Sequence, residues 1–216
     1  FAFQIIGKIA FEQANPDIIE DVDSEYSRIW IKQVSGNNKT YKTMQVENGL
    51  ESYIDEETGE MGAKYLYYYD LADYYLKDFK STLMIGGAAY TYPTHYLDKF
   101  QDKKIDVSEI DEKMTELAVE QFNLDINNER LNIYHQDGRS FLNTTKNKYD
   151  VILIDAFKGE NAPFELTTYE AMKNAKNISR KSIRMQKFSP YRPRRARASI
   201  RLRTGFSTVI KIGARD

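Results

Sequence analysis

Short apolar segments alternate with helix-like segments from residue 81 to residue 178, and this alternation most constrains how the chain can fold. Four segments read as buried strands: 81–86, 104–111, 130–138 and 149–157. The segments that follow them read as helices, the third being a short helix or a turn: 91–100, 112–124, 139–146 and 167–178. Strand and helix in turn at this rhythm predict βαβ units, and therefore a parallel sheet covered by helices on both faces.

Before this region the pattern is different. Segments 26–34, 39–46 and 50–54 are rich in β-branched and aromatic residues and are separated by polar breaks, which predicts a small antiparallel unit. Segment 63–79 has aromatic and apolar residues three to four positions apart, which predicts a helix. We therefore predict an α/β fold divided into an N-terminal β unit, a nucleoside-binding domain and a basic C-terminal segment, with boundaries 1–62, 63–178 and 179–216.

The C-terminal segment stands apart by its charge. From Lys176 onward there are 13 Lys or Arg residues and one acid, which leaves 18 basic and 31 acidic residues before it. No apolar strand is expected after Ile178 until 206–212. Three hypotheses remain open for 179–205: a shift of reading frame near Ile178 in the source gene, a basic tail that binds nucleic acid or acidic membrane, and a solvated tail. Nucleic acid is disfavoured because no aromatic residues interleave with the arginines of 192–203.

Composition excludes several classes of site. The chain has no Cys and two His, so disulfides and thiolate sites are excluded, and no metal is expected. It contains neither a Gly-x-Ser-x-Gly elbow nor a phosphate-binding loop ending in Gly-Lys. No apolar run is long enough to span a membrane. Because the chain begins with Phe1, we expect a fragment or processed form, cytoplasmic or tethered only by a membrane segment upstream.

The predicted strands end in glycines and carboxylates. In a parallel sheet the carboxyl ends of the strands meet at one edge, where ligands bind. Glycine lets the backbone approach a ligand closely, and an acid about 20 residues later is placed to bind ribose hydroxyls. The residues that this argument selects for nucleoside binding are Gly86, Gly87, Glu109, Asp111, Asp137 and Gly138, with Asp155 at the end of the fourth strand.

These segments together resemble the polyamine aminopropyltransferase family, the spermidine and spermine synthases, which have the methyltransferase-like Rossmann fold. The resemblance covers roughly 26–178. The segments that carry it are "YYDLA" (68–72), "LMIGGAAY" (83–90), "VSEID" (107–111), "HQDGRSFL" (135–142), "KYDVILIDAF" (148–157) and "PFELTTYEA" (163–171).

The resemblance implies a role for each matching position. Gly86 and Gly87 would approach the nucleoside, and Glu109 would bind its ribose. Asp137 and Gly138 would contact the adenine. The implied catalytic residues are Asp155, which would face the sulfonium or the amine, and Tyr68, which together with Asp70 would hold the amine substrate.

Two departures from the family pattern affect the chemistry. The family's turn reads Gly-Gly-Gly-Asp-Gly-Gly, whereas 86–91 reads Gly-Gly-Ala-Ala-Tyr-Thr, without the acid that grips the donor's amino group. The family's Asp-Ser-Ser/Thr-Asp-Pro supplies a base, whereas 155–159 reads Asp-Ala-Phe-Lys-Gly. Glu160 is the candidate to replace that base.

Three functions therefore stay open. The first is a transferase that uses S-adenosylmethionine or decarboxylated S-adenosylmethionine as donor, with an acceptor that the sequence does not identify. The second is a non-catalytic nucleoside-binding or interaction domain, and the third is a true polyamine aminopropyltransferase. The resemblance also implies a homodimer.

Overall fold

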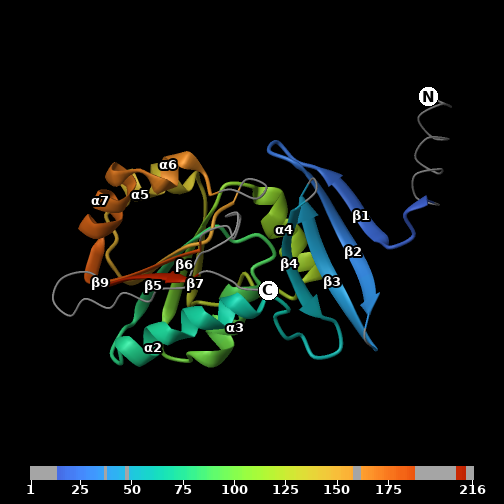
Figure 1. Ribbon diagram of the computed structural model, residues 1–216, viewed down its shortest axis with the longest axis horizontal. Coiled ribbons are helices and arrows are strands. Elements are labelled where there is room, and N and C mark those ends of the chain that lie inside the picture. The colour runs from blue at the N-terminus through green and yellow to red at the C-terminus, as the bar shows by residue number, and fades with distance from the viewer. Residues whose placement is uncertain (1–13, 37, 47–48, 158–161, 188–207, 213–216) are drawn as a thin grey trace, which may run out of the picture.

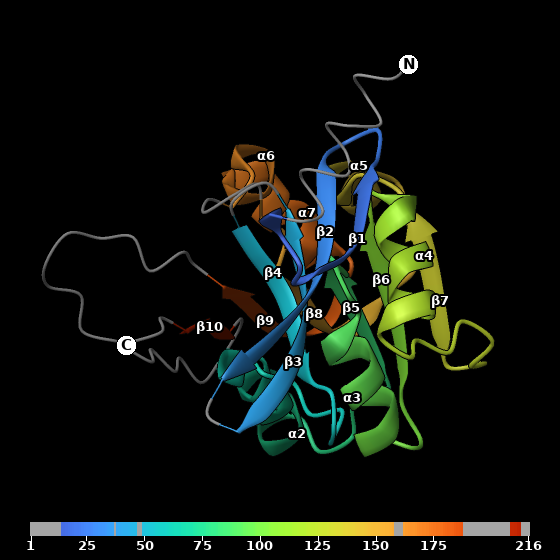
Figure 2. The same cartoon turned by 90° about the vertical axis from the view of Figure 1, so that its right-hand side faces the viewer.

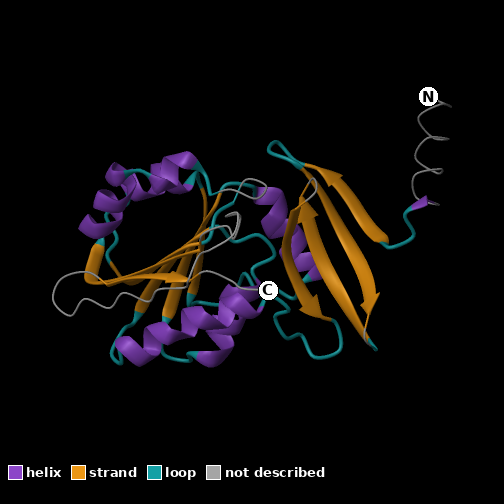
Figure 3. Ribbon diagram, in the orientation of Figure 1, coloured by secondary structure: helices purple, strands orange, loops and turns teal. Residues whose placement is uncertain are grey.

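A computed structural model of the chain describes residues 14–36, 38–46, 49–157, 162–187 and 208–212. Two sheets stand side by side, with helix α4 (Glu112–Gln121) between them (Figure 1). The larger sheet carries helices on both faces, as Figure 3 shows. Figure 2 looks onto the outer side of the smaller sheet. This architecture confirms the predicted α/β class with a small N-terminal antiparallel unit.

The larger sheet has the strand order β10-β9-β8-β5-β6-β7, and all its neighbours pair in parallel. The predicted strands are β5 (Ser81–Ile85), β6 (Lys104–Glu109), β7 (Leu131–His135) and β8 (Tyr149–Ile154). The chain runs outward from β5 to β7 and then returns to place β8 on the other side of β5. The carboxyl ends of β5 and β8 therefore form the switch point where open α/β sheets bind ligands.

Helices follow these strands as predicted. They are α3 (Thr91–Lys99), α4, α5 (Gly138–Thr144), the short α6 (Phe164–Thr167) and α7 (Tyr169–Asn177). Of the two threonines before α7, Thr168 is the cap, because its side chain accepts a hydrogen bond from the Ala171 amide.

Alternate side chains of the parallel strands enter different cores. Met84 packs with Tyr92 and Tyr96 of α3 on one face, whereas Leu83 and Ile85 pack with α5 and α7 on the other. A strand buried on both faces needs apolar residues at every position, which explains the continuous apolar runs in the sequence.

The smaller sheet is an antiparallel meander of β1 (Ile18–Asp23), β2 (Arg28–Gly36), β3 (Lys39–Val46) and β4 (Gly49–Asp55). Its inner face, which includes Ile29 and Ile31, packs against Leu117 of α4 and Phe122 just after that helix. The sequence did not predict β1, whose residues alternate between half-buried and exposed and include three acids.

The helix predicted over 63–79 is wrong in its form. The structure has a 3-10 helix, η1 (Lys64–Asp70), followed by a short α-helix, α2 (Leu71–Tyr75). The buried residues of η1 are Leu66 and Tyr69, which are three positions apart. A 3-10 helix aligns residues at this spacing on one face, so packing favours it here over the α-helix.

The expectation of no strand between 179 and 205 is also wrong. Strand β9 (Ser179–Lys187) pairs in parallel with β8, and β10 (Thr208–Ile212), within the predicted 206–212, pairs with β9. Polar and apolar residues alternate from 182 to 186, which is a strand pattern that the high basic content obscured. Residues 188–207 lie outside the described part of the chain.

Candidate functional site

The turn after β5 requires glycine at residue 86 for two reasons. Gly86 has a φ of +91°, and a Cβ at this position would lie 2.5 Å from the carbonyl oxygen of Asp155 and 3.0 Å from the Cα of Ala156. The Gly86 amide donates a hydrogen bond to the Ser108 carbonyl at 2.9 Å. The structure thus brings the ends of β5, β6 and β8 together, as the strand-end argument predicted.

Two residues other than glycine in this turn are also left-handed. Ala88 has a φ of 46° and Tyr90 a φ of 54°, a conformation that costs about 1–3 kcal/mol each. The buried ring of Tyr90 lies against Gly87, and its hydroxyl is 2.8 Å from the Thr115 hydroxyl on α4. These contacts hold the turn in its strained shape.

Ala89 of the same turn is fully buried, in the cluster that joins Ile29 and Ile31 of the smaller sheet to α4. A carboxylate at residue 89 would have to be desolvated among apolar side chains. The packing of the smaller sheet therefore accounts for the alanine that stands where the resemblance leads one to expect an acid.

Glu109, at the end of β6, is hydrogen-bonded to the backbone of the turn. Its Oε2 accepts hydrogen bonds from the amides of Gly87 (2.7 Å) and Ala88 (3.0 Å), and its Oε1 accepts one from the Asp111 amide at 3.0 Å. The side chain is almost completely buried. Two predicted nucleoside contacts, Gly87 and Glu109, are thus bonded to each other.

Asp111 has a structural role. One oxygen caps α4 by accepting from the Lys113 amide at 3.1 Å, and the other accepts from the Ser24 hydroxyl at 2.5 Å. The residue is 2% exposed, and it ties the smaller sheet to α4. Its predicted contact with the nucleoside stays a prediction.

Asp137 and Gly138 form the start of α5. The Asp137 carboxylate accepts from the Ser140 amide at 2.8 Å, which is an N-cap. A Cβ on Gly138 would lie 2.3 Å from Cγ2 of Ile85, so the absence of a side chain lets α5 pack on the end of β5. The predicted contact of these residues with adenine stays a prediction.

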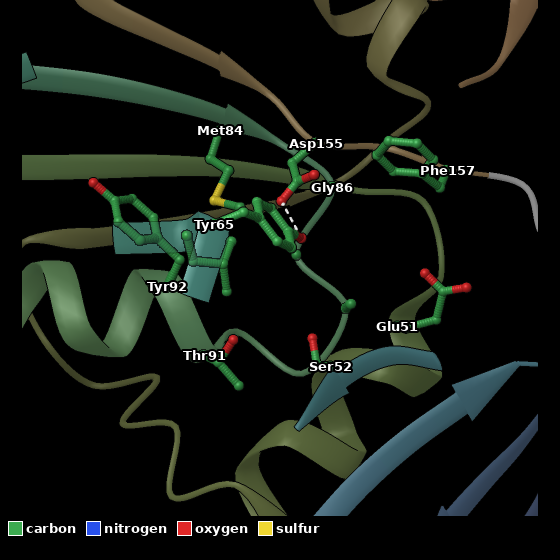
Figure 4. A pocket seen from close by; sticks show the side chains of 12 residues that line it. Glu51, Ser52, Tyr65, Met84, Gly86, Thr91, Tyr92, Asp155 and Phe157 are labelled. Atoms are coloured by element: carbon green, nitrogen blue, oxygen red, sulfur yellow. Dashed lines mark hydrogen bonds between the residues drawn. The ribbon is translucent and has the colours of Figure 1, made fainter. Parts of the chain in front are cut away.

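A pocket that is partly open to solvent lies at the carboxyl ends of β5 and β8 (Figure 4). Its walls come from β4, η1, the turn after β5, α3 and the segment after β8. The residues that line it are Glu51, Ser52, Tyr65, Leu66, Met84, Gly86, Gly87, Ala88, Thr91, Tyr92, Asp155 and Phe157.

Asp155 enters this pocket next to Tyr65. The Tyr65 hydroxyl donates a hydrogen bond to Oδ2 of Asp155 at 3.1 Å, drawn as the dashed line in Figure 4. Burial, together with the charge of Asp155, raises the pKa of Tyr65 far above its ordinary value. Tyr65 is therefore protonated, and a hydrogen-bond donor, at any physiological pH.

Tyr68 and Asp70 are not among the residues that line the pocket. The side chain of Tyr68 is 53% exposed, and Asp70 faces α3, where Nε2 of His95 lies 2.9 Å and Nζ of Lys99 2.8 Å from its Oδ2. Burial alone would raise the pKa of Asp70, but the hydrogen bonds from His95 and Lys99 hold it below its ordinary value. The amine-binding roles of Tyr68 and Asp70 stay predictions, and Glu160 lies outside the described residues.

Sequence reasoning did not single out Tyr65, Glu51 or Phe157. Tyr65 belongs to a run of tyrosines, and no local pattern distinguishes the one whose hydroxyl donates to Oδ2 of Asp155. Glu51 lies on β4, and no local pattern indicates that this strand borders the pocket. Phe157 was noticed only as a departure from the family pattern.

In the described part of the chain, no cluster of three or more His, Asp or Glu side chains could hold a metal ion. None of the helices in the same residues combines the length and the apolar character needed to cross a bilayer.

Several solved structures share this fold. A probable spermidine synthase from Corynebacterium glutamicum superposes with a TM-score of 0.62 at 20% identity, over 73% of this chain and 58% of that one. Spermidine synthase from Thermotoga maritima gives a TM-score of 0.59 at 20% identity, over 76% of this chain and 54% of that one. A spermidine synthase solved with the transition-state analogue AdoDATO gives a TM-score of 0.60 at 20% identity, over 76% of this chain and 55% of that one.

Curated proteins show the same relationship in sequence. A probable polyamine aminopropyl transferase of Bifidobacterium longum is 30% identical over 151 residues, which are 68% of this chain and 32% of that protein. The polyamine aminopropyltransferase of Alkaliphilus metalliredigens is 31% identical over 80 residues, 36% of this chain and 28% of that protein. The chain thus spans about a third of the length of these relatives.

The family model of the spermine/spermidine synthase domain matches residues 70–181, which is more than half of the chain. This match runs from the end of η1 to the beginning of β9 and contains the glycine turn, Glu109 and Asp155. The chain belongs to the spermine/spermidine synthase domain family.

Proposed function

We propose that this chain forms the site of a transferase that binds a sulfonium nucleoside, S-adenosylmethionine or its decarboxylated form, and passes an alkyl group to an acceptor. The observation that carries the proposal is the charge of the pocket. Among the described residues that line it there are two carboxylates, Glu51 and Asp155, and no Lys, Arg or His. Carboxylates and aromatic rings attract cations, and a sulfonium is a permanent cation.

The position of the pocket supports a nucleoside as the carrier of that cation. The pocket adjoins the Gly86–Gly87 turn, at the switch point where this class of sheet binds nucleotides. Glu109 lies behind the turn and would supply the contact to ribose. Relatives named as aminopropyltransferases favour decarboxylated S-adenosylmethionine as donor and an amine as acceptor.

The chemistry requires little covalent help from the protein. A lone pair of the acceptor attacks the carbon attached to sulfur, the carbon–sulfur bond breaks, and its electrons stay on sulfur, which leaves as a neutral thioether. An amine acceptor then carries an extra proton that a base must take. We assign Asp155 to the attraction of the cation, and positioning of donor and acceptor supplies most of the acceleration. Glu160 as the base, the identity of the acceptor and the homodimer stay predictions.

Calorimetric titration with S-adenosylmethionine, decarboxylated S-adenosylmethionine and methylthioadenosine tests the proposal. We expect a sulfonium to bind more tightly than the neutral methylthioadenosine, and the preferred sulfonium to separate methyl from aminopropyl transfer. Asp155→Asn should reduce the affinity for the sulfonium by about tenfold, since a lost ionic contact is worth about 1.4 kcal/mol or more. Glu109→Gln should weaken all three nucleosides.

Asp98→Asn is the matched control, because Asp98 is an exposed carboxylate on α3 that does not line the pocket. It should leave every affinity unchanged. A folded chain that binds none of the three nucleosides would contradict the proposal and would favour a non-catalytic domain. Equal affinity for charged and neutral nucleosides would contradict the role of Asp155.

A further inference from the structure

Two tyrosines of η1 lie beside the Asp155 carboxylate. Tyr65 donates a hydrogen bond to its Oδ2 at 3.1 Å. Tyr69 is 1% exposed, and in the described part of the chain its hydroxyl makes no hydrogen bond of normal geometry. Burial and then the charge of Asp155 raise the pKa of Tyr69, so that hydroxyl is also near the carboxylate. The rings of Tyr65 and Tyr69 meet edge to face, with centroids 6.2 Å apart.

The backbone of Asp155 is held separately from its side chain. Its amide donates to the Ile85 carbonyl at 2.9 Å, and Gly86 lies against its carbonyl oxygen. These contacts fix where the side chain begins and do not involve the carboxylate. The hydrogen bond from the Tyr65 hydroxyl to Oδ2 acts on the carboxylate itself and restricts its rotation.

We propose that Tyr65 is a positioning residue, which orients the Asp155 carboxylate in the pocket as a fixed anion for the cationic part of the ligand. The inference rests on the proposed function and extends it to a residue outside the predicted site. A phenol suits this role because it is a neutral donor. It orients the carboxylate without neutralising it, whereas Lys or Arg would cancel the charge that the ligand needs.

The ring of Tyr65 is itself held in place by packing. It meets Tyr69, whose ring in turn packs edge to face on Tyr92 of α3 at 5.2 Å. Tyr69 and Tyr92 are both almost completely buried, in the core cluster on that face of the sheet. The donor therefore projects from a rigid aromatic row and not from a mobile loop.

Tyr65→Phe tests the inference, because it removes the donor and keeps the ring. The readout is the ratio of affinities for two ligand pairs that differ in the charge on sulfur. These pairs are S-adenosylmethionine with S-adenosylhomocysteine, and the decarboxylated forms of both. We expect the preference for the sulfonium to fall about three- to tenfold, the value of one hydrogen bond, with the thioether affinity unchanged. Adding Asp155→Asn should then cost no more than Asp155→Asn alone.

Tyr74→Phe is the matched control, because Tyr74 is on α2, 69% exposed, and does not line the pocket. It should change neither affinity. An unchanged ratio in Tyr65→Phe would overturn the inference. So would an equal loss for sulfonium and thioether, because a purely structural role would weaken both.

A second measurement separates this inference from the proposed function. If the unmodified chain binds no nucleoside, the proposed function fails, and urea unfolding then decides about Tyr65. The losses of stability in Tyr65→Phe and Asp155→Ala should not add up in the double variant, because each substitution removes the same hydrogen bond. Additive losses would show that Tyr65 does not hold Asp155.

Discussion

At the scale of single residues, we expect Gly86 to be the position of the site where a substitution is tolerated least. Its left-handed backbone and its contact with the Asp155 carbonyl are two separate demands, and only a residue without a side chain meets both. The contact also positions the backbone of Asp155, so the shape of the pocket depends on it. A loss of Gly86 should therefore damage stability and ligand binding together.

Gly86→Ala can be compared with Gly59→Ala, because both glycines are left-handed and a Cβ on Gly59 would meet no atom within 4 Å. We expect Gly59→Ala to cost about 1 kcal/mol for the backbone strain alone. Gly86→Ala should cost about 1–3 kcal/mol more, because its methyl group collides with the end of β8. The free energy of unfolding in urea measures both. Equal losses of unfolding free energy in the two variants would mean that the turn can move away from Asp155 without loss of stability.

At the scale of secondary-structure elements, α4 connects the parts of the molecule. It packs on the parallel sheet through Ala118 and on the smaller sheet through Leu117. It begins at Glu112, three residues after Glu109, whose carboxylate holds the glycine turn. The cap of α4, Asp111, therefore combines the ordinary role of a helix cap with a link to Ser24.

Asp111→Ala should cost more than the removal of an ordinary cap. Asp137→Ala at the start of α5 removes one cap hydrogen bond, and we expect a loss of about 1 kcal/mol. Asp111→Ala removes the cap and also leaves the Ser24 hydroxyl without this acceptor, so we expect about 1–3 kcal/mol beyond that loss. Thermal or urea unfolding of both variants checks the difference. Equal losses would show that the bond to Ser24 contributes nothing to stability.

At the scale of the whole molecule, the two sheets share one core across α4. Ile29, Ile31 and Met44 of the smaller sheet belong to the same buried cluster as Ala89 of the glycine turn. Separation of the smaller sheet from the rest of the molecule would expose that cluster and the glycine turn to solvent. We infer that it unfolds together with the parallel sheet, and that it is needed for the shape of the site.

The single tryptophan of the chain, Trp30 on β2, reports on the smaller sheet. Its fluorescence and the far-ultraviolet circular dichroism should give the same midpoint in urea. Ile31→Ala should move both midpoints together, with a loss of about 2–5 kcal/mol, because Ile31 is fully buried. Val34→Ala on the same strand is the control and should have little effect, since Val34 is 40% exposed. Separate midpoints would mean that the sheets unfold independently.

Most of the fold and part of the site could be predicted from the sequence. Apolar runs, turns and caps are local signals, so strands β5 to β8 and the glycine turn were found at nearly their observed positions. The residues at the strand ends do converge: Gly86 lies against the carbonyl oxygen of Asp155, and the Glu109 carboxylate accepts a hydrogen bond from the Gly87 amide. The form of η1 and strand β9 were missed, because the first depends on what Leu66 and Tyr69 pack against and the second on pairing with β8.

By itself, the sequence determined the parallel sheet, its glycine turn and the carboxylates at the strand ends, because each of these follows from the spacing of residues along the chain. Only the tertiary structure decided which side chains share the pocket. It placed β4 and η1 beside the end of β8, so that Tyr65 meets Asp155, and it turned Asp70 toward His95 and Lys99. The reason is that contacts between residues 25 to 90 positions apart depend on how the layers pack, and local patterns do not record that packing.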